Sequence, residues 1–446
     1  MESARGMDRC CATLQATVTV CGLMLLATVA AVGGGAAAAG DADGPPAAAV
    51  APHRIDDAGA DGTAQLGPAL GVTSEGTIVV AWTDFRDGRG HVRAALSADA
   101  GETFSPSTAL PAVGANADAV PPAVQPTRRG ELLIAWHETD AGVAAPSFLL
   151  TCRLTGGGSP GFTSATPVDP PAPGVLASQA NPRAACGADG EVVLLWQDHR
   201  LGRVDIRHAR SSGGGAQLGG GEALPGAFGA GTARYLPAVA ASSTGLVLAA
   251  WWQRSNGGPW EIGTARSIDS GRTFRAGGRL GEPALSRGSA GAPAVAVSQS
   301  GHAALAWGET GGVAARHSSD GGDTFGPRIV VSAAGDYAVY PVLAAASGSD
   351  WLGLAWRDDS GTSVWVRTSA DGGASFAAPR RLNDVTAVGT VAGTPALAID
   401  DSGSVYAAWT DGRSGDYDIF FARTAPSDGA RPAAPPRELA RGFASP

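Results

Sequence analysis

A proline followed 14 or 15 residues later by a tryptophan recurs seven times in this chain of 446 residues. Each proline begins a short run of small or apolar residues. A turn follows, and a second run of apolar residues ends in the tryptophan. The pairs are Pro68/Trp82, Pro122/Trp136, Pro182/Trp196, Pro237/Trp251, Pro293/Trp307, Pro341/Trp356 and Pro395/Trp409. Two further short runs complete the unit, and four strands at a period of 49 to 60 residues are typical of a propeller blade. The repeat predicts an all-β, seven-bladed β-propeller of four-stranded blades.

The two ends of the chain predict how such a ring would close. After a third strand at residues 418–423, the seventh unit runs into a tail rich in Pro and Ala. Residues 51–57 have no unit of their own, yet they resemble residues 378–384, the predicted fourth strand of the sixth unit. We therefore predict that the N-terminal segment supplies the outer strand of the last blade, which leaves no unpaired inner edge.

The first 39 residues predict a signal peptide. Arg5 and Arg9 precede an apolar stretch over residues 11–32, and small residues at 36–39 suit a signal peptidase. The stretch is also long enough to span a bilayer, so a retained anchor is the alternative. We expect a linker over 40–50, the propeller domain over 51–424 and a disordered Pro/Ala-rich tail over 425–446. The protein is then secreted, periplasmic or extracellular, or else anchored by its uncleaved N-terminal segment.

Charge and cysteine content limit the partners. A formal net charge of −9 argues against nucleic acid, which needs a concentrated basic patch. Outside the leader the chain has Cys152 and Cys186, which can form a disulfide in an oxidising compartment or remain buried thiols. No zinc-ligand spacing or phosphate loop occurs in the sequence, so we expect no metal and no cofactor. We expect a monomer without membrane contact once the signal is cleaved.

Four units carry the motif Ser-x-Asp-x-Gly-x-Thr/Ser-Phe between their third and fourth strands. Its aspartates are Asp99, Asp269, Asp320 and Asp371. The motif resembles the Asp-box, or bacterial neuraminidase repeat (BNR), of the sialidase-like β-propeller superfamily, which includes secreted exo-α-sialidases and noncatalytic relatives. We interpret the boxes as structural, because Asp and Ser can accept backbone N–H groups within a turn and Gly supplies positive φ. Catalysis or calcium binding is the alternative, although four copies spread around a ring cannot converge on one substrate.

The resemblance also implies an alternative fold and a catalytic set. Family sialidases have six blades, three arginines on the substrate carboxylate, a Tyr–Glu nucleophile pair and an Asp acid/base. Arginine forks suit a carboxylate because they bind it bidentately. The family's Arg-Ile-Pro signature is absent, since Gly67 precedes Pro68 and Arg54-Ile55-Asp56 stands one strand too early. The remaining catalytic candidates are Tyr340, Arg183, Arg234 and Arg357.

Topology places the loops before each proline and after each tryptophan on one face, and the Asp-boxes on the other. Three of these loops share the pattern Trp-x-Asp-x-Arg, at Asp84, Asp198 and Asp411. One interpretation is a set of Asp–Arg pairs that bind a ligand. We prefer the other, a repeated turn in which Asp caps the loop and Arg pairs with that Asp or with a neighbour. Other polar residues expected on this loop face are Arg86, Asp87, His137, Glu138, Arg200, Arg254, Glu309, Asp359 and Arg413. The binding candidates are Asp198, His199, Tyr235 and Asp358.

These observations predict a secreted noncatalytic β-propeller that binds a glycan, peptide or protein partner through its charged loop face. One alternative is a sialidase-like exo-glycoside hydrolase, and another is a cell-surface adhesion or assembly module. Three arginines converging beside a Tyr–Glu pair would favour the hydrolase. Arginines with separate partners on separate blades would favour the binding protein.

Overall fold

The computed structural model describes residues 48–57, 62–112, 117–127, 132–140, 148–155, 161–170, 178–212, 217–226, 232–255, 258–280, 291–309, 312–332, 338–358, 360–383 and 391–425. The predicted signal peptide, most of the predicted linker, almost all of the predicted tail and Asp359 lie outside these residues. So does the side chain of Cys152, and the Cys152–Cys186 disulfide therefore stays a prediction. Within the described part, no helix is long and apolar enough to cross a membrane.

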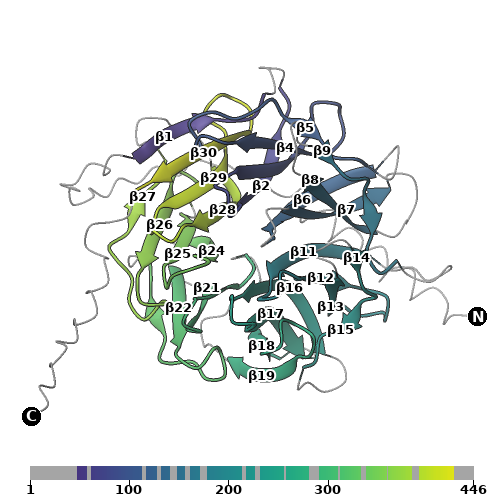
Figure 1. The fold of residues 1–446 in the computed structure, drawn as a ribbon, viewed down its shortest axis with the longest axis vertical. Helices are drawn as coiled ribbons and strands as arrows, with labels where there is room; N and C mark the ends of the chain where they lie inside the picture. The colour runs from purple at the N-terminus through teal and green to yellow at the C-terminus, as the bar shows by residue number, and fades with distance from the viewer. Residues whose placement is uncertain are drawn as a thin grey trace, which may run out of the picture. The chain divides into compact units, whose positions relative to one another are not determined.

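The chain is an all-β propeller with blades built on four-stranded sheets, as predicted (Figure 1). The described strands form seven antiparallel sheets, two of which carry one additional short strand. The first three sheets along the chain contain β2 (Gln65–Val72), β3 (Ile78–Asp84), β4 (His91–Ser97) and β5 (Thr108–Ala109); β6 (Ala117–Pro126), β7 (Leu132–Asp140), β8 (Phe148–Thr155), β9 (Gly161–Phe162) and β10 (Thr166–Pro167); and β11 (Gln179–Cys186), β12 (Val192–Asp198), β13 (Asp205–Ser212), β14 (Gln217–Leu218) and β15 (Glu222–Ala223).

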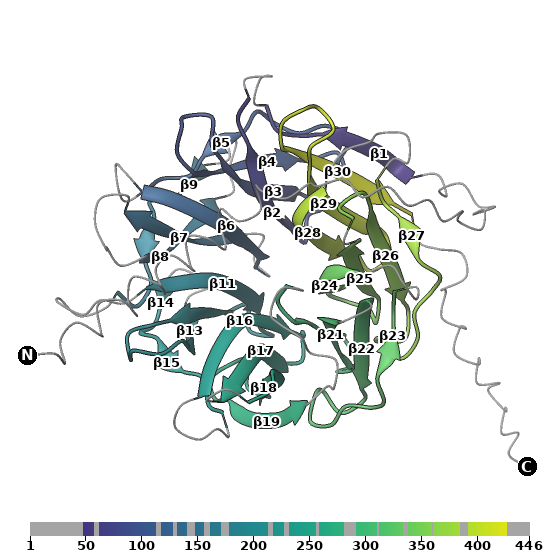
Figure 2. The same cartoon turned by 180° about the vertical axis from the view of Figure 1, so that it is seen from behind.

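The other four sheets contain β16 (Thr232–Ala241), β17 (Val247–Ser255), β18 (Glu261–Ser267) and β19 (Arg275–Leu280); β20 (Ala294–Val297), β21 (Ala303–Glu309), β22 (Gly312–Ser318) and β23 (Ile329–Val330); β24 (Val339–Ala345), β25 (Leu352–Arg357), β26 (Val364–Ser369) and β27 (Arg380–Arg381); and β1 (Ala48–Arg54), β28 (Val391–Ile399), β29 (Val405–Asp411) and β30 (Asp418–Thr424). The first long strand of each unit is the inner strand. Inner strand β2 contacts β6 and β28, and the contacts continue through β11, β16, β20 and β24 (Figures 1 and 2). The sheets therefore close into a ring.

The repeated tryptophans form the core between sheets. Each lies on the second strand of its sheet and is at most 1% exposed. In one such contact, Trp136 and Ile134 of β7 pack in one cluster with Val79 and Ala81 of β3. Because both faces of each inner sheet region are covered by a neighbour, these strands are continuously apolar rather than alternating. The tryptophans thus fill the space between successive blades.

The N-terminal strand closes the last sheet, as predicted. This sheet has the order β1-β30-β29-β28, and β1 pairs antiparallel with β30. The strand begins at Ala48, three residues before the predicted start of the domain and inside the predicted linker. Val50 explains the difference, because its side chain is buried in a cluster that includes Ile55 and Phe421. The N-terminal strand therefore joins the last sheet through its backbone pairing with β30 and the buried side chain of Val50.

The Asp-box loops are held by bonds within each box. At the first box, Ser97 Oγ accepts the Gly101 N–H at 2.8 Å, and Asp99 accepts the Thr103 N–H at 2.9 Å and its hydroxyl at 2.6 Å. The same three bonds recur in the other boxes. Gly101 has a φ of 92°, and a Cβ there would lie 2.2 Å from the Phe421 ring. The aspartates thus have their oxygens directed into their own turns.

These bonds predict a loss of stability in acid. Bonds from Thr324 hold the pKa of Asp320 at about 2, below its ordinary value of 3.8. Because the pKa is lowered in the folded state, the stabilisation is present above about pH 4 and is lost as the pH falls towards about 2. Denaturant unfolding at pH 4.5 and pH 2.5 should show this loss. Over the same pH interval, the Asp320→Asn variant should lose less stability than the wild type. The difference between the two losses should be under about 1 kcal/mol, since the loop is exposed. An unchanged pH dependence in the variant would contradict this assignment.

Candidate functional site

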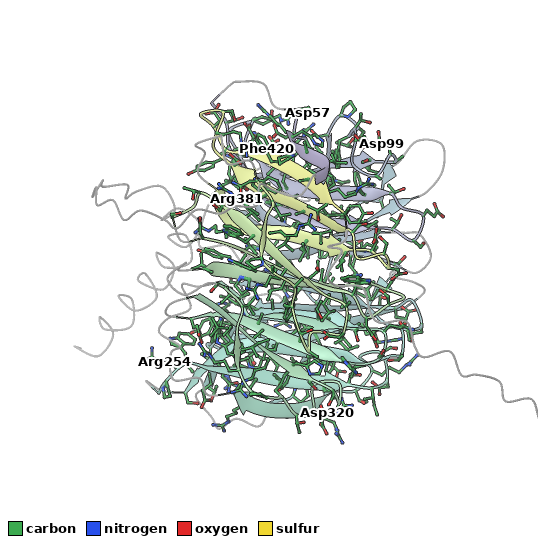
Figure 3. All side chains as sticks on the ribbon, turned by 90° about the vertical axis from the view of Figure 1, so that its left-hand side faces the viewer. Asp57, Asp99, Arg254, Asp320, Arg381 and Phe420 are labelled. Atoms are coloured by element: carbon green, nitrogen blue, oxygen red, sulfur yellow. The ribbon has the colours of Figure 1, made fainter. Side chains whose placement is uncertain are left out.

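The loop face and the Asp-boxes lie on opposite sides of the ring. In the side view of Figure 3, Arg254 is on one side, and Asp99 and Asp320 are on the other. The loop face contains the turns that follow the tryptophan-bearing strands and the entrances to the inner strands. Both kinds of segment carry the residues predicted to form a site.

The indole groups of six repeated tryptophans donate to the side chain two residues further on. Trp82 Nε1 lies 3.1 Å from Asp84 Oδ2, and Trp409 Nε1 lies 3.0 Å from Asp411 Oδ2. Equivalent bonds of 3.1 to 3.3 Å join Trp136 to Glu138, Trp196 to Asp198, Trp251 to Gln253 and Trp307 to Glu309. Residues two apart on a strand share a face, and a buried N–H needs an acceptor. Many of the polar residues predicted for the loop face therefore serve the core.

The Trp-x-Asp-x-Arg loops are turns held by their own charges. Asp198 Oδ1 accepts the backbone N–H and the Nε of Arg200, both at 2.9 Å, and Oδ2 accepts Nη2 at 2.8 Å. Corresponding pairs form at Asp84/Arg86 and Asp411/Arg413. Burial would raise the pKa of Asp198, but the bonds from Arg200 hold it below its ordinary value. The Asp198 side chain is 1% exposed and has little surface to offer a ligand.

The sixth unit departs from this arrangement. Strand β25 ends at Arg357, so Asp358 lies in the following loop, where its Oδ1 accepts the Thr362 N–H at 2.8 Å and the Ser363 N–H at 3.1 Å. Among the residues described, Trp356 Nε1 is buried without a hydrogen-bond partner. Asp358, predicted to bind a ligand, thus caps the loop between β25 and β26.

Two histidines of the loop face are neutral at neutral pH. Burial lowers the pKa of His137 to about 4. Burial also lowers the pKa of His199, and the neighbouring carboxylate of Asp198 opposes the shift. A residue with a pKa well below 7 does not supply a proton at neutral pH. His137 is therefore not a general acid at neutral pH, and the lowered pKa of His199 disfavours the same role.

A bulge opens most inner strands at the loop face. Six of the described inner strands change register around the repeated proline, which has no N–H to give to the ladder. The residue before the proline has positive φ in Asn181 (53°), Leu236 (52°) and Tyr340 (56°). Such values are strained for bulky residues and occur most often near functional sites. The bulges reorient the side chains at the entrance to each inner strand.

At three positions the residue that follows a repeated tryptophan bonds the entrance of the next sheet's inner strand. Gln197 Oε1 accepts the Leu236 N–H at 2.8 Å and the Asn181 Nδ2 at 2.7 Å. Thr410 Oγ1 accepts the Gly67 N–H at 3.3 Å. Trp252 Nε1 donates to the Gly291 carbonyl at 2.9 Å. Sequence reasoning missed these positions, although their fixed place directly after the tryptophan could have indicated them.

Two candidate arginines have separate partners. Arg234 on β16 lies 2.6 Å from Asp205 and donates to the Leu224 carbonyl at 2.7 Å, which ties it to the preceding sheet. The Arg357 guanidinium carbon lies 4.8 Å from the centre of the Tyr340 ring. In the described part of the chain, no carboxylate forms a hydrogen bond with the Tyr340 hydroxyl. The Tyr–Glu pair implied by the sialidase resemblance is therefore not formed at Tyr340.

Arg183 stands where the other six units carry alanine or valine, directly after the proline. Arg183 pairs with Leu195 in the β11–β12 ladder. Leu195 lies in a hydrophobic cluster that includes residues of the sheet of β16. Its Nη1 donates to the Pro182 carbonyl at 2.9 Å, and no described carboxylate lies within ion-pair distance. Burial lowers the pKa of Arg183, although an arginine stays charged at neutral pH. Arg183, Arg234 and Arg357 thus lie on three sheets, and the contacts described above give each a different partner.

Tyr235, Trp260 and Arg254 form an aromatic patch on the loop face. The Tyr235 and Trp260 rings meet edge to face, with centroids 5.6 Å apart, and Arg254 lies 5.7 Å from the Trp260 ring. Arg254 Nε also donates to the Gly258 carbonyl at 2.7 Å, which fixes the loop that carries Trp260. Both rings are half-buried and Arg254 is exposed. Burial raises the pKa of Tyr235, against the opposing charge of Arg254, so its hydroxyl remains protonated. Sequence reasoning found Tyr235 but missed Trp260, which belongs to no repeat.

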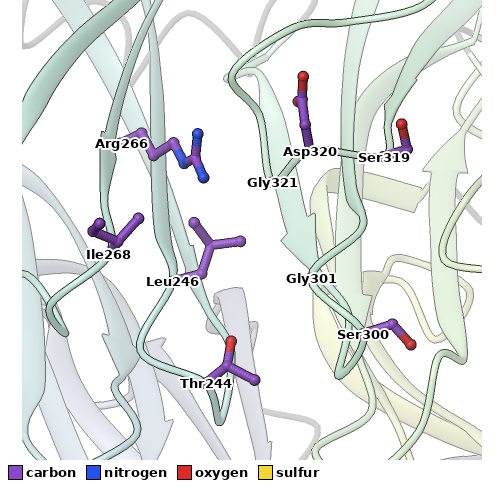
Figure 4. Close-up of a pocket in the computed structure, with 9 residues that line it drawn as sticks. All are labelled: Thr244, Leu246, Arg266, Ile268, Ser300, Gly301, Ser319, Asp320 and Gly321. Atoms are coloured by element: carbon purple, nitrogen blue, oxygen red, sulfur yellow. The ribbon is translucent and has the colours of Figure 1, made fainter.

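A hollow of about 310 Å³ lies on the opposite face, between the sheets of β16–β19 and β20–β23 (Figure 4). Leu246, Arg266 and Ile268 line one side, and Ser300 and Asp320 line the other. Arg266 lies 3.2 Å from Asp323, and the Asp320 carboxylate is bonded within its own box. Asp320 is therefore bonded within its own box, whereas Arg266 and Ser300 bond acids of the following sheet, Asp323 and Asp350, rather than a common point.

Comparison with known proteins identifies the fold. No protein-family model matches the sequence, and no curated protein does. Among solved structures, the Hadza microbial sialidase Hz136 is 15% identical with a TM-score of 0.51, over 84% of this chain and 68% of the sialidase. The α-L-arabinanase of Penicillium chrysogenum is 12% identical, with a TM-score of 0.48 over 86% of this chain and 99% of the other. The GH93 α-L-arabinofuranosidase of Fusarium graminearum is 11% identical, with a TM-score of 0.48 over 84% and 97%. The likeness to the sialidase shows that this chain has a β-propeller fold similar to that of the sialidase, and the four Asp-boxes agree with it.

Proposed function

We propose that this protein is a secreted, noncatalytic propeller that binds a glycan through the Tyr235–Trp260–Arg254 patch. The observation that carries the proposal is the half-buried Tyr–Trp pair on the loop face, braced by an exposed arginine. Aromatic side chains offer a large rigid contact area together with a polar group, as a ligand with both apolar and hydroxyl faces requires. The N-terminal leader of the sequence supports secretion.

The sialidase-like exo-hydrolase is the second candidate, because the structural neighbours include a sialidase. It is less well supported by the arrangement of residues. Arg234 is committed to Asp205, Arg357 lies over Tyr340, and Arg183 stands on a third sheet. A carboxylate-binding set needs guanidinium forks directed at one point. The separate partners of these arginines favour the binding protein.

We further propose that each of the seven sheets is one blade of the ring. The successive contacts of inner strands β2, β6, β11, β16, β20, β24 and β28 support this count. The sialidases that this chain resembles have six blades. An additional blade widens the ring and changes the relative positions of equivalent loops, which is a further reason not to transfer the sialidase catalytic set to this chain.

Trp260→Ala is expected to weaken glycan binding by roughly 30-fold, the factor that corresponds to loss of a central aromatic contact of about 2 kcal/mol. The ligand is first identified on an array of sialylated, uronic-acid and neutral oligosaccharides. Its affinity is then measured by titration calorimetry for the wild type and the variant. Trp365→Ala is the matched control, since Trp365 is also half-buried but lies on β26. It should leave the affinity unchanged.

A fluorogenic sialoside distinguishes the two candidates. The binding protein should release no fluorophore, whereas turnover that Tyr340→Phe abolishes would establish the hydrolase. Absence of binding to every oligosaccharide, or equal loss of affinity in the Trp260 and Trp365 variants, would contradict the proposed patch.

A further inference from the structure

Two of the seven histidines meet on the Asp-box side of the sheet β20–β23. His302 lies in the turn between β20 and β21, where its carbonyl accepts the Ser298 N–H at 2.8 Å. His317 is the next-to-last residue of β22 and pairs with Ala304 in the ladder. His317 Nε2 lies 3.4 Å from His302 Nδ1, and the ring centroids are 5.2 Å apart with the planes at 67°. Both side chains are half-buried, so solvent reaches the pair.

The two distances fit ligands of one tetrahedral ion better than a direct hydrogen bond. A protein hydrogen bond from nitrogen usually spans about 2.7–3.2 Å, and 3.4 Å is longer. With metal–nitrogen bonds of about 2.05 Å at a tetrahedral angle, two imidazole nitrogens lie about 3.35 Å apart and the ring centres about 5.2 Å apart. A linear bond across 3.4 Å would instead place the ring centres about 5.7 Å apart. The observed separation of 5.2 Å matches the metal-bound arrangement more closely than the linear hydrogen bond.

The surroundings suit a cation. Gly372 of the next sheet lies against His302, and a Cβ there would be 2.8 Å from Nδ1, so glycine leaves this nitrogen unobstructed. Burial lowers the pKa of His317, the neighbouring His302 lowers it further, and Asp371 opposes both. Asp350 lies near His302 and Asp371 near His317, and these carboxylates give the pair a negative environment.

We propose that His302 and His317 form a two-histidine site for a divalent transition metal ion, Cu²⁺ or Zn²⁺, with water completing the coordination. Imidazole nitrogen suits these ions, and Cu²⁺ binds most tightly in the first-row series. In the described part of the chain no group of three or more His, Cys, Asp or Glu side chains could hold a metal, so the pair supplies two ligands. The ion would join the end of β22 to the turn that precedes β21. This site is separate from the aromatic patch of the loop face and does not depend on it.

The test uses the full secreted chain, stripped with a chelator and titrated with CuCl₂ and with ZnCl₂ by calorimetry. We expect saturable 1:1 binding of each ion and a copper electron paramagnetic resonance spectrum with splitting from two imidazole nitrogens. His302→Ala and His317→Ala should each weaken Cu²⁺ binding at least about tenfold and remove one nitrogen from the spectrum. Lowering the pH to 5 should weaken binding, because protons compete for the imidazoles.

Two controls keep the result specific. His91→Ala removes a half-buried histidine on β4, remote from the pair in the sequence, and should leave both affinity and spectrum unchanged. His317→Gln keeps a polar side chain of similar size and serves if the alanine variant does not fold, as judged by circular dichroism. Absence of 1:1 binding, or a spectrum that neither pair variant alters, would overturn the proposal.

Discussion

Asp198→Ala is expected to lower the free energy of unfolding by about 3–5 kcal/mol, the usual cost of removing one partner from a buried ion pair. Asp198 accepts the Trp196 indole at 3.3 Å and both the backbone and the guanidinium of Arg200. Its removal leaves a fully buried N–H without an acceptor and leaves Arg200 with Asp169 as its remaining carboxylate, at 2.8 Å. Equilibrium unfolding in guanidinium chloride, followed by tryptophan fluorescence, measures the change.

Asp358→Ala is the matched control for this prediction. Asp358 was a ligand candidate of the same kind, but it lies half-buried in a loop and accepts bonds from Thr362 and Ser363. Its loss should cost no more than about 1 kcal/mol. If Asp198→Ala instead unfolded within 1 kcal/mol of the wild type and lost ligand binding, Asp198 would be a ligand residue and not a support for the core.

The indole bond can be isolated by a second comparison. Trp196→Phe and Trp356→Phe remove similar volumes from equally buried positions. Trp196 loses a bond to Asp198, whereas Trp356 loses an N–H that has no partner in the described structure. Trp196→Phe should therefore cost about 1.5–3 kcal/mol more than Trp356→Phe. Equal costs would show that the indole bond adds nothing to stability.

The sequence was most informative where one physical constraint recurs. The spacing of proline and tryptophan predicted the strands because each blade must bury the same large side chain at the same place. The orphan segment at residues 51–57 predicted the closing strand because the seventh unit lacked an outer strand. Both predictions depend on how the strands are buried and paired, and they do not depend on a ligand or on surface residues. The sheet order β1-β30-β29-β28 confirms the closure.

The function of the polar residues after each tryptophan was harder to predict. Asp84, Asp198 and Asp411 follow the end of an apolar run, where a sequence suggests the start of an exposed loop. Their carboxylates instead turn back to the buried indoles, because an enclosed N–H without an acceptor is costly. A linear pattern gives the position of a side chain along a strand but not which neighbour it bonds.

The two proposed binding features depend on contacts that no local pattern encodes. Trp260 meets Tyr235 across 25 positions of sequence, and His302 meets His317 across a hairpin. Neither Trp260 nor the histidines recur in the other units, so the repeat gave no reason to select them. Departures from the repeat are therefore the places to search for function in this fold, whereas the repeated residues maintain the ring.

Asp56→Ala is expected to weaken the closure of the ring and to lower the free energy of unfolding by about 3 kcal/mol. The Asp56 side chain is fully buried, and its Oδ2 accepts the Ile419 N–H of β30 at 2.8 Å. Its Oδ1 accepts Arg54, which also lies 3.0 Å from Asp418. The variant leaves the buried Ile419 N–H without this acceptor. Denaturant unfolding measures the loss, and faster proteolysis near the N-terminus should accompany it.

Asp56 and Asp57 are consecutive acids that bind two different sheets, so we expect Asp56 to contribute to the closure of the ring. Asp57 accepts the Ser107 N–H at 2.8 Å and Arg86 at 2.7 Å, both from the first sheet, while Asp56 binds the last. Asp87→Ala, which removes an exposed acid from the same face, should change stability by no more than about 0.5 kcal/mol. If Asp56→Ala were equally mild, the backbone ladder between β1 and β30 would be sufficient to close the ring. If it behaves as expected, the ring is closed by a pair of acids that fixes the last sheet to the first.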